Sequence, residues 1–171
     1  TSLFKKLYYL NESRLLKKYE KAIANKATVL AVSQQDVDLY KKEFIATDIH
    51  YLPVFLGFWF VVGVDGKGCF CLYHGNLAIN ENESAATWLL ERVFNKLSIP
   101  LVIAGKNPSK KLEDLAHQHQ HTCLVANPSE KEMQDMNGKA HVHVLPSFNN
   151  TGIKLKLLNA LFNGRHCLVN Q

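Results

Sequence analysis

Hydrophobic residues recur along the chain in two alternating patterns. Short, nearly continuous apolar runs predict buried strands at residues 28–32, 49–55, 70–73, 101–104, 122–125, 142–145 and 165–169. Segments with apolar residues three and four positions apart predict helices at residues 3–27, 33–44, 83–97, 109–117, 129–137 and 153–163. Alternating strands and helices of this kind predict an α/β fold, a Rossmann-like parallel sheet with helices on both faces.

A glycine-rich segment interrupts this alternation and predicts a domain boundary. Residues 57–68 contain four glycines, which is typical of a linker or turn. We therefore expect three parts: residues 1–50 with a helix and a strand–helix unit, a crossover linker over 51–68, and the sheet domain over 69–171. The chain begins with Thr1 and stops after an apolar run, so we expect a piece of a longer protein.

Composition narrows the class of protein. With 171 residues, 47% hydrophobic and 20% charged, the chain is too short for a large multidomain enzyme and too apolar to remain disordered. No uninterrupted apolar stretch reaches the length of a spanning helix. The four cysteines lack metal-type spacing, and no secretory signal opens the chain, so we expect buried thiols in a cytoplasmic protein.

Charge is unevenly distributed. The net charge is +5, and no carboxylate follows Asp135, whereas Lys139, Lys154, Lys156 and Arg165 do. This end is predicted to carry a positive potential and to favour an anionic ligand. Chance clustering, with partners supplied by sequence further downstream, is the alternative. No basic aromatic patch supports nucleic-acid binding.

The loops that follow the predicted strands are rich in glycine and small polar residues. In open parallel sheets, ligands bind beyond the carboxyl ends of the strands, where helix N-termini present N–H groups. These loops contain Gly75-Asn76, Gly105-Lys106, Asn127-Pro128-Ser129 and the segment from Ser147 to Gly152. They suit a phosphate, although neither GxGxxG nor GxxxxGK[ST] is present.

The last predicted helix carries a polar stripe. Its members are Gly152, Lys156, Asn159 and Asn163, and Leu157, Leu158, Leu161 and Phe162 are expected to face the core. Thr151 would cap the helix, and the Lys156 ammonium would add to the helix dipole in binding a pyrophosphate. A capped surface helix with a solvated lysine is the alternative.

Histidines offer two further candidates. His74 ends a predicted strand, where a ligand contact and a structural role are both open. His117, His119 and His121 alternate near a helix end, but this spacing points the side chains apart, so we expect solvated histidines and no metal.

Several of these segments, in order, resemble the retaining glycosyltransferases of the GT-B fold, group 1 (family four). The resemblance is carried by Leu145-Pro146-Ser147, Thr151-Gly152, the run from Asn159 to Gly164, and Cys167-Leu168-Val169. A subgroup with Gly-x-Arg-x-Lys before the helix is matched better still, through Gly152, Lys154 and Lys156. Upstream, residues 29–36 and 51–53 resemble the end of the acceptor domain and the crossover. Residues 73–76 together with 81–88 resemble the first donor-domain unit.

The resemblance implies a donor-binding half that, in a longer parent, moves a hexose from a nucleoside diphosphate sugar to a carbohydrate or lipid-linked acceptor, without a metal or other cofactor. It implies catalytic roles for Thr151, Lys106 and Lys156. Donor-binding roles are implied for Gly75, Asn76, Lys106, Asn127, Ser147, Gly152, Lys154, Lys156 and Asn159. Peripheral membrane contact would pass through the missing part of the acceptor domain.

Two departures from the family pattern bear on activity. Thr151 and Asn159 stand where family members carry glutamates that bind the sugar and the ribose. We therefore expect the fragment to be inactive alone. A non-catalytic nucleotide- or partner-binding module of the same fold is the alternative reading.

Overall fold

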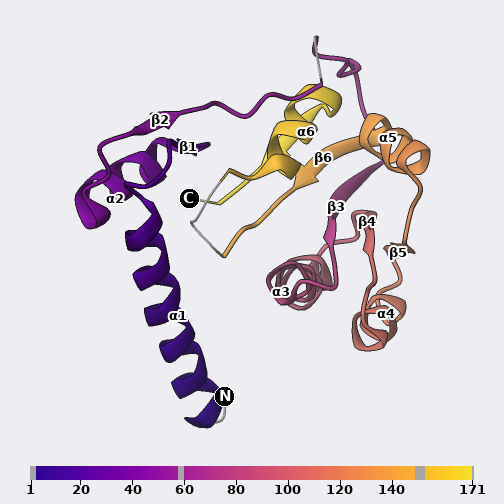
Figure 1. The fold of residues 1–171 in the computed structure, drawn as a ribbon. Coiled ribbons are helices and arrows are strands. Elements are labelled where there is room, and N and C mark those ends of the chain that lie inside the picture. The colour runs from indigo at the N-terminus through magenta and orange to yellow at the C-terminus, as the bar shows by residue number, and fades with distance from the viewer. Residues whose placement is uncertain (1–2, 58–59, 149–152, 171) are drawn as a thin grey trace. The chain divides into compact units, whose positions relative to one another are not determined.

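The chain folds into two compact units. The computed structural model describes residues 3–57, 60–148 and 153–170 (Figure 1). The units are Thr1–Leu56 and Gly57–Gln171, so the division falls within residues 51–68. The assignment of these parts to an acceptor and a donor domain remains a prediction.

The second unit is built on a parallel sheet. Its strands are β3 (Phe70–Asn76), β4 (Leu101–Lys106), β5 (Thr122–Ala126), β6 (Ala140–Val144) and β7 (His166–Leu168). The five strands are ordered β5-β4-β3-β6-β7, and every neighbouring pair is parallel. The predicted Rossmann-like α/β fold is therefore confirmed.

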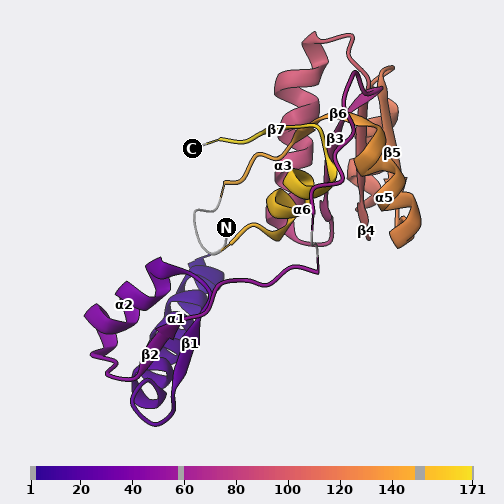
Figure 2. The same ribbon diagram turned by 90° about the horizontal axis from the view of Figure 1, so that it is seen from above.

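Helices cover both faces of this sheet. They are α3 (Asn80–Trp88), continued by a π turn (Leu89–Val93) and a 3-10 turn (Phe94–Lys96), then α4 (Lys110–His117), α5 (Glu130–Lys139) and α6 (Leu155–Asn163). Apolar residues of α3 and α4 pack with Tyr73 and Ile103 on one face. Methionines of α5 pack with Leu72 and Ala104 on the other, so α3 and α5 lie on opposite sides of β3 (Figure 2). Helix α6 packs beside α5 and β7.

Serines set the start of two of these helices. Ser109 accepts a hydrogen bond from the backbone N–H of Leu112, and Ser129 forms a full capping box with Glu132. Each satisfies N–H groups that the first helical turn leaves without an intrahelical partner. Both lie at the first residue of a predicted helix.

Two strands extend further than predicted. β3 continues to Asn76 and β4 to Lys106, because Gly75 pairs with Gly105 and Asn76 with Lys106 in the parallel ladder. These four residues are thus the last residues of strands and not loop residues, which corrects the prediction. Helix α3 also begins at Asn80, three residues before the predicted start at residue 83.

The first unit is smaller. It contains α1 (Leu3–Ile23), β1 (Val29–Ala31), α2 (Gln34–Phe44) and β2 (Ile49–Tyr51), with β1 and β2 forming a parallel pair. Its core consists of Ala24, Ala31, Val37, Phe44, Ala46 and Ile49. Helix α1 has 21 residues and none is buried. Within the described residues, α1 included, no helix is long and apolar enough to cross a membrane.

The cysteines differ from expectation. Cys69 and Cys123 are exposed, and Cys71 and Cys167 are half-buried, so the prediction of four buried thiols is wrong. Cys123 lies on β5, an edge strand, and Cys69 lies just before β3 begins. Apolar sequence context therefore overestimated burial at the margins of the sheet.

Candidate ligand site at the carboxyl edge of the sheet

The strand order of the second unit reverses between β3 and β6. From β3 the chain proceeds outward to β4 and β5, and then returns to β6 on the other side of β3. In open parallel sheets, this reversal creates a crevice beyond the carboxyl ends of the two strands, and ligands bind there. In this chain the corresponding region, called the crevice below, is bordered by the end of β3, the start of α3, residues 145–148 after β6 and the start of α6.

Lys156 reaches into this region from the first turn of α6. Its Nζ donates to Asn82 Oδ1 at 3.3 Å and lies 5.1 Å from the centre of the Tyr73 ring. The Tyr73 hydroxyl donates in turn to the Asn82 carbonyl at 2.9 Å. Burial lowers the pKa of Lys156, while the carboxylate of Glu81 opposes this change. The ammonium is thus half-buried and held by an aromatic face and an amide.

Helix α6 begins later than predicted. Its first residue is Leu155 and its N-cap is Lys154, so Lys156 lies in the first turn and not one turn in. Lys154 makes no side-chain capping hydrogen bond within the described residues, and its charge adds a small effect to the lowering of the Lys156 pKa. The predicted cap Thr151 and the predicted backbone contact at Gly152 lie outside the described residues.

Ser147 and Glu81 connect the two sides of the crevice. Ser147 Oγ donates to Glu81 Oε1 at 3.4 Å, joining the segment after β6 to the first turn of α3. Asn170 fixes the Ser147 backbone by accepting from its N–H and donating to its carbonyl, both at 2.8 Å. Glu81 also contributes to raising the pKa of Tyr73, after the larger effect of burial.

Sequence reasoning did not single out Glu81. The helix was predicted to begin at residue 83, which left Glu81 in a loop. The available signal was an acidic residue followed by an amide, Glu81-Asn82, directly after the first strand of an open sheet. In the structure these two residues contact Ser147 and Lys156, which come from two other elements.

His74 is buried beside this site, on the face that α5 covers. It is only 8% exposed, and its Nε2 has no hydrogen-bond partner among the residues that the structure describes. Its ring meets that of His143 edge to face, with centroids 6.0 Å apart. Burial, with smaller effects from His143 and Lys156, lowers the pKa of His74 to about 4. At neutral pH the imidazole is therefore uncharged.

The two predicted phosphate-loop glycines have different surroundings. A Cβ on Gly105 would lie 2.0 Å from the Gly75 carbonyl oxygen and 2.8 Å from Leu77 Cγ, so packing between strands requires this glycine. Gly105 was predicted to border a phosphate, but packing already explains it. A Cβ on Gly75 would meet only the Asn82 side chain, at 3.2 Å.

Two predicted donor-binding asparagines form hydrogen bonds within loops, Asn76 in its own turn and Asn127 with the loop after β4. Asn76 Oδ1 accepts from the Ala78 N–H at 3.2 Å. Asn127, which has a positive φ of 52°, accepts from the Asn107 N–H at 2.8 Å through its Oδ1. Asn127 follows β5, two strands away from β3. It therefore lies apart from the residues around Lys156.

The other predicted residues also differ in whether they lie near Lys156. Lys106 is exposed at the end of β4, next to Asn76 in the ladder. Asn159 Oδ1 accepts from Asn163 Nδ2 at 2.7 Å, so the polar stripe of α6 is partly bonded to itself. Leu161 is 53% exposed, which corrects its predicted place in the core. The structure thus places Lys156, Ser147 and Gly75 around the neighbouring residues Glu81 and Asn82.

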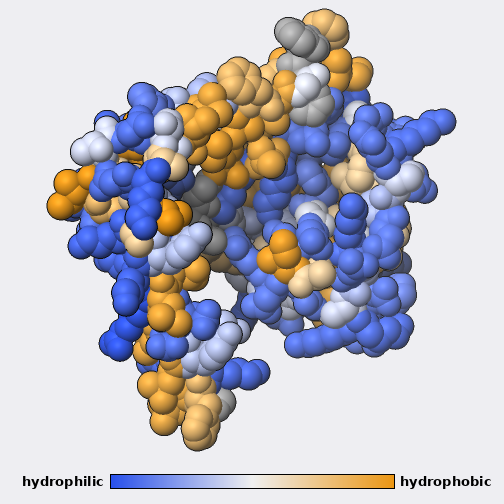
Figure 3. Space-filling view, in the orientation of Figure 1, coloured by the Kyte–Doolittle hydropathy of each residue, from blue (hydrophilic) through white to orange (hydrophobic). Residues whose placement is uncertain are grey.

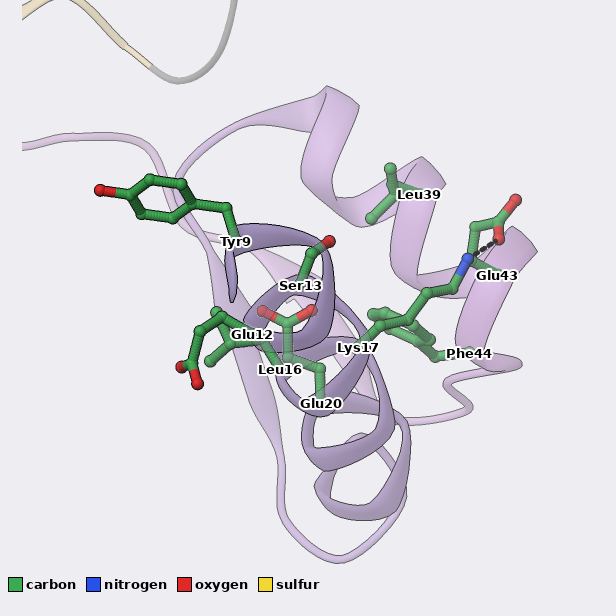
Figure 4. A pocket seen from close by; sticks show the side chains of 9 residues that line it. All are labelled: Tyr9, Glu12, Ser13, Leu16, Lys17, Glu20, Leu39, Glu43 and Phe44. Carbon is green, nitrogen blue, oxygen red and sulfur yellow. Dashed lines mark hydrogen bonds and ion pairs between the residues drawn. The ribbon is translucent and has the colours of Figure 1, made fainter. Parts of the chain in front are cut away.

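Grooves also occur elsewhere in the described parts of the chain. One of about 610 Å³ lies between α1 and α2 and is lined by Leu16, Leu39 and Phe44, with Lys17 and Glu43 paired across it at 2.9 Å (Figure 4). A second, of about 330 Å³, includes His119 and His121, and a third, of about 490 Å³, lies beside Trp88. No three metal-ligating side chains cluster anywhere in the described ranges.

Comparison with known proteins gives one informative relative. No family model matches the chain. The chain is 29% identical, over 174 aligned positions, to an uncharacterized 44.6 kDa protein in cps region from Klebsiella pneumoniae. The alignment covers 95% of this chain, which spans 44% of the length of that relative. The two proteins are distantly homologous, and the likeness itself names no activity.

Proposed function

We propose that the chain is the donor-binding half, with a trailing piece of the acceptor half, of a retaining GT-B glycosyltransferase. The observation that carries this proposal is the half-buried Lys156, held at the reversal point of the sheet among polar side chains from three elements. Homology to a protein of a capsule-synthesis region supports a role in sugar transfer.

The chemistry of such a site is electrostatic. As the sugar–phosphate bond breaks, negative charge develops on the departing diphosphate. The ammonium groups of Lys156 and Lys154, together with the N–H groups that open α6, would stabilise that charge. Lys106, on the neighbouring strand end, would add a third cation at the margin of the site. None of these contributions requires a metal ion.

The remaining parts of the chain have roles within this proposal. Residues 1–50 would belong to the acceptor domain, residues 51–68 would cross over, and residues 69–171 would bind the donor. Transfer to a carbohydrate or lipid-linked acceptor would take place in the cytoplasm and would require the whole longer protein. The chain by itself is expected to bind a nucleoside diphosphate but not to transfer sugar.

Isothermal titration with UDP and with GDP tests the proposal. We expect millimolar to micromolar dissociation constants for one of them, and a loss of about tenfold in Lys156→Met, equivalent to about 1.4 kcal/mol. Lys139→Met is the matched control, because Lys139 precedes β6 and pairs with Asp135 at 2.7 Å. Absence of binding to both nucleotides, or equal affinity in Lys156→Met, would contradict the proposal.

One observation favours a second candidate, a non-catalytic binding module of the same fold. Positions 151 and 159 lack carboxylates, and Asn159 is bonded to Asn163. Incubating the full-length parent with nucleotide sugars and capsule oligosaccharides separates the two functions. Release of nucleoside diphosphate together with a lengthened oligosaccharide supports the enzyme, whereas binding without turnover supports the module.

A further inference from the structure

We infer that Glu81 is the sugar-recognising carboxylate of this site and takes the place of the acidic side chains that positions 151 and 159 lack. The inference rests on the proposed function, because it assigns the sugar-binding part of the same site. It also predicts that the site prefers a ligand that joins an anionic group to neutral hydroxyl groups.

The position of Glu81 supports this role. It lies in the first turn of α3, directly after β3, and accepts a hydrogen bond from Ser147 across the crevice at 3.4 Å. The next residue, Asn82, accepts from Lys156 at 3.3 Å. One turn of α3 therefore carries a carboxylate directed to the β6 side and an amide directed to α6.

Among the described elements that border the crevice, α3 is the one that contains carboxylates. The opposite side is formed by the segment after β6 and by α6, and no Asp or Glu follows Asp135 anywhere in the sequence. Glu83, in the same first turn, is bonded instead to Ser109 at the N-terminus of α4. Glu81 is thus the acidic residue of α3 that contacts the β6 side.

The juxtaposition of Glu81 and Lys156 indicates what kind of ligand fits. Lys156 donates to Asn82, the residue that directly follows Glu81 in the first turn of α3, and the Glu81 carboxylate opposes the lowering of the Lys156 pKa. A site for a bare anion gains nothing from a carboxylate, because the carboxylate repels the anion. A sugar supplies hydroxyl donors that an ionised carboxylate accepts in charge-assisted hydrogen bonds. Lysine and glutamate side by side therefore match a diphosphate linked to a sugar.

The test compares the dissociation constants of a nucleotide and of the matching nucleotide sugar. Both are measured by isothermal titration of the whole chain, once with UDP and UDP-glucose and once with GDP and GDP-mannose. In Glu81→Gln we expect affinity for the sugar-linked ligand to fall about tenfold relative to the nucleotide. Affinity for the nucleotide alone should stay equal or rise slightly, since a repulsive charge is removed. Glu81→Asp, which keeps the charge but shortens its reach, should show the same selective loss.

Glu83→Gln is the matched control and should leave both affinities unchanged, because its partner is Ser109. Thermal unfolding of each variant confirms that it is folded. An unchanged ratio, or equal loss for both ligands in Glu81→Gln, overturns the inference while leaving the proposed function standing. If the wild-type chain binds no nucleotide and no nucleotide sugar, the proposed function and the inference both fail.

Discussion

The two units of this chain use the same kinds of element but bury them to very different extents. In the second unit, Leu72, Tyr73 and Ile103 are fully buried, and helices pack on both faces of a five-stranded sheet. In the first unit, two strands carry a small core, and the longest helix of the chain buries no residue. Segments with similar hydrophobic patterns in the sequence can therefore bury very different shares of their apolar side chains.

The parallel pair of the first unit shows the difference most clearly. Ala31 of β1 is 8% exposed and packs in the core, whereas its neighbour Leu30 is 59% exposed. Parallel sheets are normally covered on both faces. Apolar residues also run along α1 beside its hydrophilic ones (Figure 3). In the second unit, helices cover both faces of the strands.

The largest expected effect compares one leucine in each unit. Leu90 is fully buried, so Leu90→Ala should lower the free energy of unfolding of the second unit by about 2–5 kcal/mol. Leu7 is 56% exposed, so Leu7→Ala should change stability by no more than about 0.5 kcal/mol. Urea denaturation followed by tryptophan fluorescence and by far-UV circular dichroism measures both. A Leu7→Ala effect as large as that of Leu90→Ala would show that α1 is packed.

The next effect is a loss of stability as the pH falls from 6.5 to about 4, which should be confined to the second unit. The pKa of His74 falls to about 4 in the fold from 6.5. Between these two values the unfolded chain binds a proton that the folded chain does not, so stability declines as pH falls, by about 3 kcal/mol in total. Burial lowers the pKa of His143 as well, which adds to the same decline. In His74→Phe, the free energy of unfolding, measured by urea denaturation, should depend less on pH.

The first unit provides the contrast for this experiment. Hydrogen bonds from Thr28 and His50 lower the pKa of Asp48 below 3.8. The stability that this carboxylate contributes is therefore present above pH 3.8 and is lost only as pH falls further. A decline of the first unit between pH 6.5 and 4 that matches the second would contradict the assignment to His74.

The smallest expected effect concerns surface ion pairs, which should be equally weak in both units. Lys17 pairs with Glu43 at 2.9 Å in the first unit, and Lys139 with Asp135 at 2.7 Å in the second, with all four side chains substantially exposed. Double-mutant cycles to Gln and Asn should give coupling energies of about 0.2–1 kcal/mol that fall with added salt. A coupling well above this range for Lys17 would mark it as part of a packed interface.

Local sequence signals predicted where these helices start more accurately than they predicted which residues form the site. Ser33, Ser109 and Ser129 were each placed at the start of a helix, and each caps one, because capping depends on a few adjacent residues. Lys156 was predicted from its place in the helix that follows the predicted strand at residues 142–145. Glu81 was missed, because its significance depends on Ser147, 66 residues away in sequence.

The sequence by itself determined the alternation of strands and helices, the α/β class and the excess of positive charge after Asp135, since periodicity and composition are local properties. Tertiary structure alone decided which polar residues meet. The order β5-β4-β3-β6-β7 makes β3 and β6 neighbours, so that the first turns of α3 and α6 meet through Asn82 and Lys156, while Asn127 is left two strands away from β3. The physical reason is that strand pairing joins residues far apart in the chain, and no local pattern records which strands become neighbours.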